Sequence, residues 1–165
     1  MDIEFRKLRE FPRGTFYSLL ADAYAFEPRY ERENGERWRA DEAFFLDNPH
    51  IGDQYCIVTA LAGEPIGLIA WDPRNLPDFA IVGDNCIAAK HKGKGYGGRQ
   101  LREAVGRMVA AGARTIYVST DNALIPAQRM YEGVGFRRLD PAALAPWQIE
   151  QHADIYYALP VVEIP

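Results

Sequence analysis

The sequence predicts an α+β protein, an α/β mixed sheet with helices on its faces. Short apolar or β-branched segments alternate with helical segments in the order β-α-α-β-β-β-α-β-α-β-β. One passage, from a strand at 79–88 through a helix to a strand at 115–120, predicts a parallel pair. Tight turns between the other strands predict antiparallel pairing, so both kinds of pairing are expected in one sheet.

Length and composition indicate one soluble domain. The 165 residues fit a single domain over residues 1–165, at about 150 residues per domain. A hydrophobic share of 48% and a charged share of 25% exclude intrinsic disorder. No apolar run approaches the roughly 18 residues of a membrane span. The first residues lack the basic-then-apolar layout of a secretion signal. We therefore expect a cytoplasmic protein that binds no membrane.

The net charge argues against nucleic-acid binding, and the Cys and His residues argue against metal binding. The chain has 19 basic and 23 acidic residues, a net charge of −4, which argues against nucleic acid as a partner. Cys56 and Cys86 form no disulfide or metal pattern. His50, His91 and His152 show no ligand spacing, so no metal is expected.

The first predicted elements are a strand and two helices. Apolar and polar residues alternate over 3–5, as in a short strand. Segment 15–26 places its apolar residues near one helix face. The highly charged segment 28–47 predicts a surface helix over the core, which ends near Asn48-Pro49.

A hairpin and a further strand follow. Strands are predicted over 54–61 and 66–71, with a turn at 62–65 between them. Residues 72–77 are rich in turn formers and predict a loop before the strand at 79–88. The remaining predicted elements are a glycine cluster at 93–98, a helix that ends at Gly112, a strand at 115–120, a short helix at 126–133, and strands at 136–139 and 155–162.

The glycine cluster is the first candidate for a binding site. Residues 92–98 read Lys-Gly-Lys-Gly-Tyr-Gly-Gly and lie between a predicted strand and a predicted helix. Glycines allow a ligand to approach the backbone closely. The free amides and the dipole of a helix N-terminus favour phosphate groups, and Lys92 and Lys94 add positive charge. The alternative is a flexible glycine turn before a helix.

Two other phosphate-binding patterns were compared with this cluster. The nucleoside-triphosphatase pattern fails, because no Ser or Thr stands where it requires one. A dinucleotide fingerprint does match at Gly93, Gly95 and Gly98, with Asp121 as a possible ribose-binding acid. Only 44 residues follow Asp121, too few for the rest of a doubly wound sheet. A dinucleotide-binding protein therefore stays as an alternative.

Two motifs together resemble the GCN5-related N-acetyltransferase (GNAT) family. Residues 92–97 are similar to its Gln/Arg-x-x-Gly-x-Gly/Ala signature, with Lys92 in place of Gln or Arg. Residues 127–136 are similar to its second signature, Ala-x-x-x-Tyr-Glu-x-x-Gly-Phe. Ile87 and Ala89 stand where the family often has valine and proline, so the proline is missing. Residues 71–77 and 83–87 resemble an uncharacterised bacterial subgroup.

This resemblance implies a GNAT-like acyl-CoA N-acyltransferase fold, with a central, mostly antiparallel mixed sheet. It implies direct transfer of an acetyl group from acetyl-coenzyme A to a primary amine of a small molecule or peptide, through a tetrahedral intermediate. The amide of Ile87 would bind the thioester oxygen. The residues expected to contact the cofactor are Ile87, Ala88, Lys92, Gly93, Lys94, Gly95, Tyr96, Gly97, Gly98 and Asn122. Asn122 lies two residues from the family's usual spacing and is equally consistent with a turn cap.

Two residues are the catalytic candidates. Tyr131 matches the family's general acid, which would protonate the leaving thiolate; its structural alternative is a tyrosine packed on the sheet. Asp84, on the strand before the glycine cluster, is the first candidate for the general base, and its alternative is a plain strand-surface residue. Asp72 and the acidic residues at 31–36 are weaker candidates.

The acceptor site is expected on the first two helices and a late loop. Tyr30, Glu31 and Trp38 are expected to line it, and Asn85 to orient water or substrate. Acidic and aromatic groups suit a cationic amine, although the acidic residues also fit a solvated helix face. Other residues expected there are Tyr24, Glu27 and Trp147. A monomer or homodimer is expected, and a non-catalytic acetyl-CoA-binding regulatory module is the alternative function.

Overall fold

A mixed sheet of seven strands is the framework of the structure, a computed structural model that describes residues 2–140, 143 and 153–162. The strands are β1 (Ile3–Arg6), β2 (Cys56–Leu61), β3 (Glu64–Asp72), β4 (Ala80–Ile87), β5 (Thr115–Thr120), β6 (Arg137–Arg138) and β7 (Ile155–Pro160). Their order is β1-β2-β3-β4-β5-β7-β6. β4 and β5 are parallel, whereas β1–β2, β2–β3, β5–β7 and β6–β7 are antiparallel. The predicted class, a mostly antiparallel mixed sheet, is confirmed.

Helices connect these strands. They are η1 (Leu8–Glu10), α1 (Thr15–Ala23), α2 (Pro28–Asp47), α3 (Pro49–Tyr55), η2 (Ala89–His91), α4 (Tyr96–Ala110) and α5 (Ile125–Val134), where η marks a short 3₁₀ helix. Over the described residues, no helix combines the length and apolar character needed to cross a bilayer.

The contacts divide the chain into two compact units. The first unit comprises Met1–Trp71 and Asp84–Gln100, and the second comprises Asp72–Gly83 and Leu101–Pro165. The expectation of a single domain over residues 1–165 stays a prediction.

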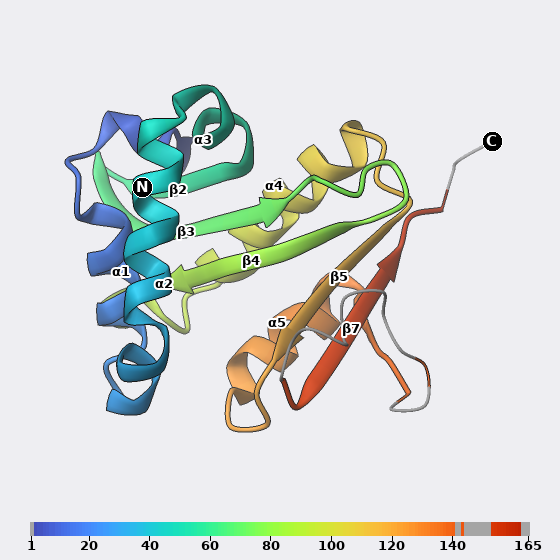
Figure 1. The fold of residues 1–165 in the computed structure, drawn as a ribbon. Helices are drawn as coiled ribbons and strands as arrows, with labels where there is room; N and C mark the ends of the chain where they lie inside the picture. The colour runs from blue at the N-terminus through green and yellow to red at the C-terminus, as the bar shows by residue number, and fades with distance from the viewer. Residues whose placement is uncertain (1, 141–142, 144–152, 163–165) are drawn as a thin grey trace. The chain divides into compact units, whose positions relative to one another are not determined.

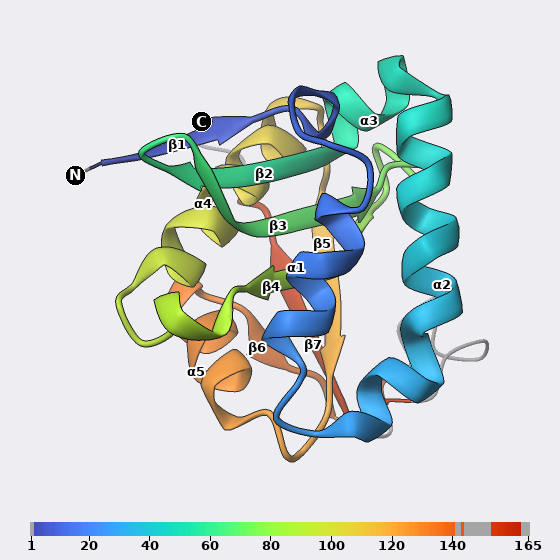
Figure 2. The same cartoon turned by 90° about the vertical axis from the view of Figure 1, so that its left-hand side faces the viewer.

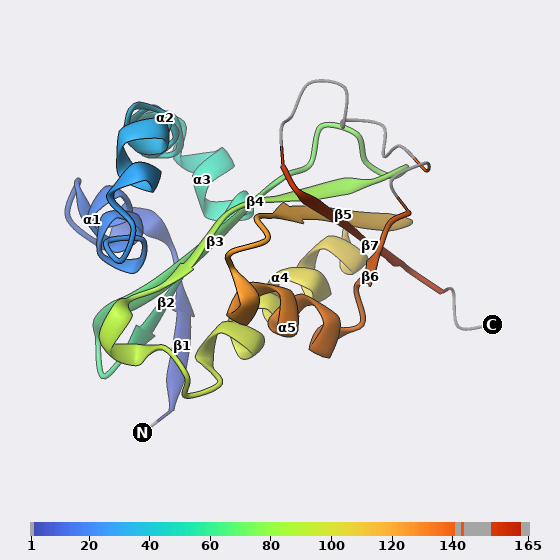
Figure 3. The same ribbon diagram turned by 90° about the horizontal axis from the view of Figure 1, so that it is seen from below.

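In the first unit, α1 and α2 cover one face of the sheet. β1, β2 and β3 lie side by side, and both helices pack on the same side of them (Figures 2 and 3). β2 and β3 are buried along most of their length, as apolar strands covered on both faces should be. Phe16 and Leu20 of α1 join Ile57 and Leu68 of these strands in the core.

The helix ends in the first unit follow from local chemistry. Pro28 begins α2, where a missing N–H costs nothing, and the side chain of Glu27 accepts a hydrogen bond from the amide of Arg29. Ala62 and Gly63 both have positive φ, the geometry of the tight turn that closes the β2–β3 hairpin.

In the second unit, α4 and α5 lie on one face of β5 and β7 (Figures 1 and 3). Residues of β5 alternate between buried and half-buried positions, as expected for a strand with unequal faces. Ala80 and Ile81 of β4 pair with Ile116 and Tyr117 of β5, which gives the predicted parallel pair. Gly135, with φ +114°, ends α5.

Some predicted boundaries were wrong. Residues 54–55 belong to α3, so the strand predicted over 54–61 begins at Cys56. Pro49 begins this unpredicted helix, and a Cβ on Gly52 would lie 2.6 Å from the carbonyl oxygen of Phe45. Glycine therefore lets α3 pack closely against α2. The strand predicted over 136–139 is reduced to Arg137–Arg138.

Candidate functional site

The glycine segment leads directly into the N-terminus of α4. Gly93 and Gly95 have φ of +77° and +84°, a backbone conformation that favours glycine, and the space beside each Cα is open. α4 begins at Tyr96, so the amides of Tyr96, Gly97 and Gly98 lie in the first helical turn. Amides in that turn lack acceptors within their own helix and carry partial positive charge. An anionic group such as a phosphate can bind there.

Two lysines in this segment have different surroundings. The ammonium group of Lys92 donates a hydrogen bond to the carbonyl of Ala23 and lies 4.9 Å from the centre of the Phe26 ring. Burial lowers the pKa of Lys92. Lys92 thus ties the segment to the end of α1, and both lysines keep exposed surface.

The end of β4 lies beside α1. The amide of Ala88 donates to the carbonyl of Ile66 at 2.7 Å, so this amide is already used within the sheet. The amide of Ala89 donates to the Asp22 carboxylate at 2.8 Å. An open hollow of about 420 Å³ adjoins these contacts and is lined by Ser18, Leu19, Asp22, Ala88, Ala89 and Lys90.

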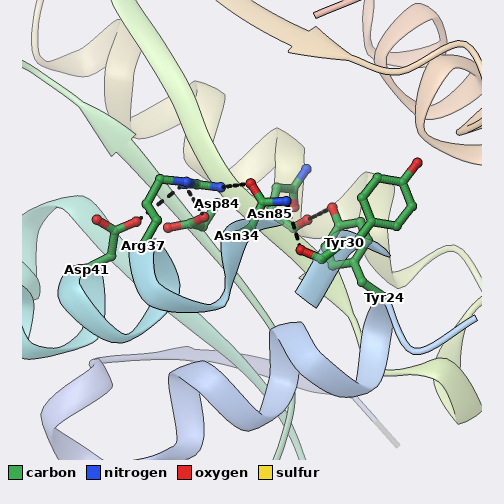
Figure 4. Close-up of polar contacts among 7 residues, drawn as sticks. All are labelled: Tyr24, Tyr30, Asn34, Arg37, Asp41, Asp84 and Asn85. Atoms are coloured by element: carbon green, nitrogen blue, oxygen red, sulfur yellow. Dashed lines mark hydrogen bonds and ion pairs between the residues drawn. The ribbon is translucent and has the colours of Figure 1, made fainter. Parts of the chain in front are cut away.

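A buried carboxylate on β4, that of Asp84, contacts an arginine of α2 (Figure 4). The Asp84 side chain is only 5% exposed, and its Oδ1 accepts a hydrogen bond from Nη1 of Arg37 at 2.9 Å. The same Nη1 lies 3.4 Å from Oδ2 of Asp41, one helical turn further along α2. Asp84 is therefore a buried, paired residue and not an exposed one on the strand surface.

Asp41 has a shifted pKa in this arrangement. Burial, a hydrogen bond with Asp84 and the charge of Asp84 raise the pKa of Asp41 to about 8, although Arg37 opposes the shift. Two neighbouring carboxyls cannot both ionise easily, because the negative charge of one disfavours ionisation of the other.

Asn85 is held from both sides of the sheet. Its Oδ1 accepts a hydrogen bond from Nε2 of Gln100 at 2.9 Å, and its carbonyl accepts one from the Tyr24 hydroxyl at 3.1 Å. Neighbouring side chains on a strand point to opposite faces. Asp84 accordingly contacts α2, while the Asn85 side chain contacts the start of α4.

Gln100, near the start of α4, forms hydrogen bonds with three strands of the first unit. It is fully buried, and its Nε2 also donates to the carbonyls of Leu68 and Cys86 at 2.8 and 3.2 Å. Its Oε1 accepts from the Thr59 hydroxyl at 2.7 Å. These bonds satisfy a buried amide that would otherwise be destabilising and fix β2, β3 and β4 relative to one another.

Aromatic side chains of α1 and α2 form a cluster near Asn85. The Tyr24 ring stacks on Trp38 with centroids 5.8 Å apart and lies 5.4 Å from Tyr30. Trp38 and Tyr30, both predicted acceptor contacts, are 2% and 6% exposed. Phe26, at 61% exposure, presents its ring to solvent beside them.

Glu31 adjoins the cluster through Tyr17, whose ring lies edge-on to that of Trp38 with centroids 6.1 Å apart. Its carboxylate accepts a hydrogen bond from the Tyr17 hydroxyl at 2.5 Å. It lines an open groove of about 460 Å³ together with Tyr17, Pro28, Arg32, Gly35, Glu36 and Arg39. Trp147, also expected at the acceptor site, lies outside the described residues.

Two predicted site residues belong to the second unit. Tyr131 is 5% exposed, and its ring lies 5.9 Å from the rings of both Phe136 and Tyr157. The exposed Asn122 has its amide bonded to Asp154 at 3.0 Å and its carbonyl bonded to Nε2 of Gln128 at 3.0 Å. Its backbone therefore closes a turn, and its contact with the cofactor stays a prediction.

The two cysteines are unsuited to nucleophilic catalysis. Both thiols are free and buried, and burial raises their pKa values, that of Cys86 to about 12. They stay protonated at neutral pH and contribute to the core.

The fold and the glycine segment before α4 define the class of an acetyltransferase. The family model for the acetyltransferase (GNAT) family matches residues 14–136, and the chain belongs to this family. A search of curated proteins found no significant match.

Similar solved structures agree with this fold. A GNAT-family acetyltransferase from Desulfovibrio desulfuricans is 18% identical, with a TM-score of 0.71 over 98% of this chain and 100% of that one. The PaiA N-acetyltransferase from Thermoplasma acidophilum, solved with coenzyme A, is 15% identical, with the same TM-score and coverage. N-acetylglutamate synthase from Neisseria gonorrhoeae, solved with coenzyme A and N-acetylglutamate, is 13% identical. Its TM-score is 0.67 over 99% of this chain and 36% of its own.

Sequence reasoning missed three residues of the candidate site. Arg37 and Asp41 stand four apart on a helix, a spacing that identifies a side-chain pair but not its contact with Asp84. Gln100 stands four residues before the buried Ala104, so a polar residue on the buried helix face was the available signal.

Proposed function

We propose that this acetyltransferase moves the acetyl group of acetyl-coenzyme A directly to a primary amine of a small molecule or peptide. The acceptor ammonium first loses a proton, and the nitrogen lone pair then attacks the thioester carbonyl carbon. A carbon–nitrogen bond forms, and the carbon–sulfur bond breaks in the collapse of the tetrahedral intermediate. The products are the amide, the coenzyme A thiol and one proton.

The glycine segment before α4 is the observation that carries this proposal. Open backbone at Gly93 and Gly95 and the first-turn amides from Tyr96 to Gly98 suit the pyrophosphate of coenzyme A. Lys94 would add positive charge from its exposed position. The coenzyme A bound to the PaiA protein and to N-acetylglutamate synthase supports this ligand.

Asp84 is the proposed general base. An alkylammonium with a pKa near 10 is mostly protonated at neutral pH, so a base must remove a proton before attack. The buried Asp84 carboxylate, held by Arg37 on the strand that leads to the glycine segment, can receive it directly or through water.

Two further groups complete the proposed chemistry. The Ile87 amide would bind the thioester oxygen as it becomes an oxyanion. Tyr131, in the second family motif, would protonate the leaving thiolate and recover a proton from the new amide nitrogen. The acceptor ammonium thus loses two protons, one to the base and one, through Tyr131, to the thiolate.

The acceptor proposed here is cationic before it reacts. Arg37 supplies one positive charge against the two carboxyls of Asp84 and Asp41, so the group is anionic when both are ionised. The exposed ring of Phe26 can contact a cation through its face. Asn85, Tyr30 and Trp38 are proposed to shape the adjoining wall.

The ligand is tested by calorimetric titration with acetyl-coenzyme A, coenzyme A and NAD. We expect binding of both coenzyme A species and no binding of NAD. Binding of NAD alone would instead support the dinucleotide fingerprint at Gly93, Gly95 and Gly98. A panel of primary amines, read by thiol release, then tests turnover.

Gly95→Trp tests whether the glycine segment is the binding site. Gly63→Trp is a matched control, because Gly63 has the same kind of positive φ (+82° against +84°) and equally open space, but lies in the β2–β3 turn. Both variants carry similar backbone strain, and only Gly95→Trp should lose coenzyme A binding. Equal affinity in the two variants would refute the assignment.

A further inference from the structure

Asp84 is not an isolated carboxylate. Nη1 of Arg37 lies 2.9 Å from Oδ1 of Asp84 and 3.4 Å from Oδ2 of Asp41, so the two carboxyls share one cation. The Asp84 side chain is 5% exposed, whereas those of Asp41 and Arg37 are 35% and 55% exposed, so water reaches the group from the side of α2. Figure 4 shows both carboxyls facing the same guanidinium.

We propose that Asp41 is a positioning residue for the acetyl transfer: with Asp84 and Arg37 it forms a carboxyl pair that takes up and releases one proton as a unit. This inference rests on the proposed role of Asp84 as general base. The pair, and not Asp84 alone, would then set the pH at which the enzyme accepts a proton from the acceptor.

The benefit of a pair is a stronger base. A single Asp carboxylate, with a pKa near 4, is about six units weaker than an alkylamine and removes its proton poorly. Two carboxyls that share a proton titrate in two steps, and the second step lies much higher. The pKa of about 8 at Asp41 brings the pair within about two units of the amine.

The proton transfer balances with the proposed reaction. The doubly ionised pair takes one proton from the acceptor ammonium, which leaves a neutral amine and a singly protonated pair. After the products form, the pair releases this proton to solvent. The second proton of the reacting nitrogen reaches the thiolate through Tyr131, as proposed above.

Among the described groups around the pair, the two carboxyls are the ones expected to take up and release the proton. Arg37 of α2 lies between the carboxyls, and its Nη2 donates to Oδ1 of Asn34 of α2 at 3.3 Å. The thiols of Cys56 on β2 and Cys86 on β4 feel the Asp84 charge and stay neutral, because burial raises their pKa values. From the end of α1, the hydroxyl of Tyr24 is bonded to Asn85.

The test is the pH dependence of kcat/KM with amines of different pKa. A limb of the pH profile that moves with the pKa of the amine reports ionisation of the substrate. A limb that does not move reports an ionising group of the enzyme. We expect an enzyme limb near pH 8 in the wild type. Asp41→Asn should move it to lower pH and lower kcat/KM at pH 9 roughly tenfold or more. Arg37→Gln should move it to higher pH, because a cation that favours ionisation is removed.

A second measurement needs no turnover and remains informative if activity is low. The folded pair keeps a proton that unfolded carboxyls release above their ordinary pKa near 4, so stability should fall as pH rises from about 4 to about 8. Asp41→Asn should lack this fall, so its melting temperature should increase relative to that of the wild type as pH rises. Glu4→Gln, an exposed change on β1, is the control and should alter neither profile.

The outcomes separate the two proposals. An unmoved limb and an unchanged stability profile in Asp41→Asn, with activity lost in Asp84→Asn, would overturn the pair and keep Asp84 as the base. Full activity in Asp84→Asn would overturn the base assignment and the pair with it. Movement of both profiles in Asp41→Asn supports the pair.

Discussion

At the scale of single residues, Glu42 joins two helices of the first unit. Its buried carboxylate accepts hydrogen bonds from the amides of Gly14 and Phe16 at 3.0 and 2.9 Å. Gly14 stands at the N-cap of α1 and has no side-chain oxygen, so a residue of α2 supplies the cap. α1 in turn places Tyr24 against Asn85.

Replacement of Glu42 tests the energy of this cap. Glu42→Ala leaves two amides without their charged acceptor and should lower the free energy of unfolding by about 3 kcal/mol. Glu42→Gln keeps one acceptor oxygen and should recover part of the loss. Urea denaturation measures both, with exposed Glu33→Ala as a control expected within about 0.5 kcal/mol of the wild type. If Glu42→Ala matches that control, the cap contributes little.

Arg37, Asp41 and Asp84 show where sequence reasoning ends at this scale. The sequence identifies Asp84 as a candidate base because it precedes the glycine segment on a strand, a local relationship. Its partner Arg37 lies 47 residues away. Such a contact depends on how α2 lies over the sheet, and one sequence carries no periodic signal for it.

At the scale of elements, β3 and β4 meet closely at Gly67. A Cβ at this position would lie 2.6 Å from both the carbonyl oxygen of Cys86 and Cδ1 of Ile87, and 2.9 Å from Oε1 of Gln100. Glycine thus lets β3 approach the end of β4, where the thioester is proposed to bind.

Gly67→Ala should disturb this approach. The methyl group would push against backbone, so we expect a loss of about 1–3 kcal/mol in stability and weaker acetyl-coenzyme A binding. The matched change is Gly106→Ala in α4, which has open space around it and should stabilise by about 0.5–1 kcal/mol. Denaturation and calorimetry of both variants measure this, and a neutral Gly67→Ala would show that the strands can shift at no cost.

Most elements were predictable because their patterns are local. Charge and apolar spacing gave α2, and β-branched alternation gave β5. α3 was missed because Gln54 and Tyr55 directly precede the apolar strand Cys56–Leu61 and read as its beginning. Its packing on α2 through Gly52 is a tertiary contact, which the spacing of apolar residues in the sequence does not indicate.

At the scale of the whole molecule, the two family motifs belong to different units. The first unit carries Asp84 and the glycine segment, and the second carries Tyr131. The glycine signature and the tyrosine motif are far apart in the sequence, and the family model matches a range that includes both, residues 14–136. If Tyr131 is the general acid, loss of its hydroxyl should lower turnover without weakening cofactor binding.

Tyr131→Phe tests that separation. The ring packs on Phe136 and Tyr157, and phenylalanine keeps these contacts, so the fold should persist. If the hydroxyl protonates the thiolate, kcat should fall about 100-fold while acetyl-coenzyme A affinity stays unchanged. Tyr117→Phe on β5 removes a hydroxyl from the same unit and should leave kcat within twofold or so of the wild type. Equal turnover in the two variants would mean that water or another group protonates the thiolate, and that Tyr131 is a packing residue of α5.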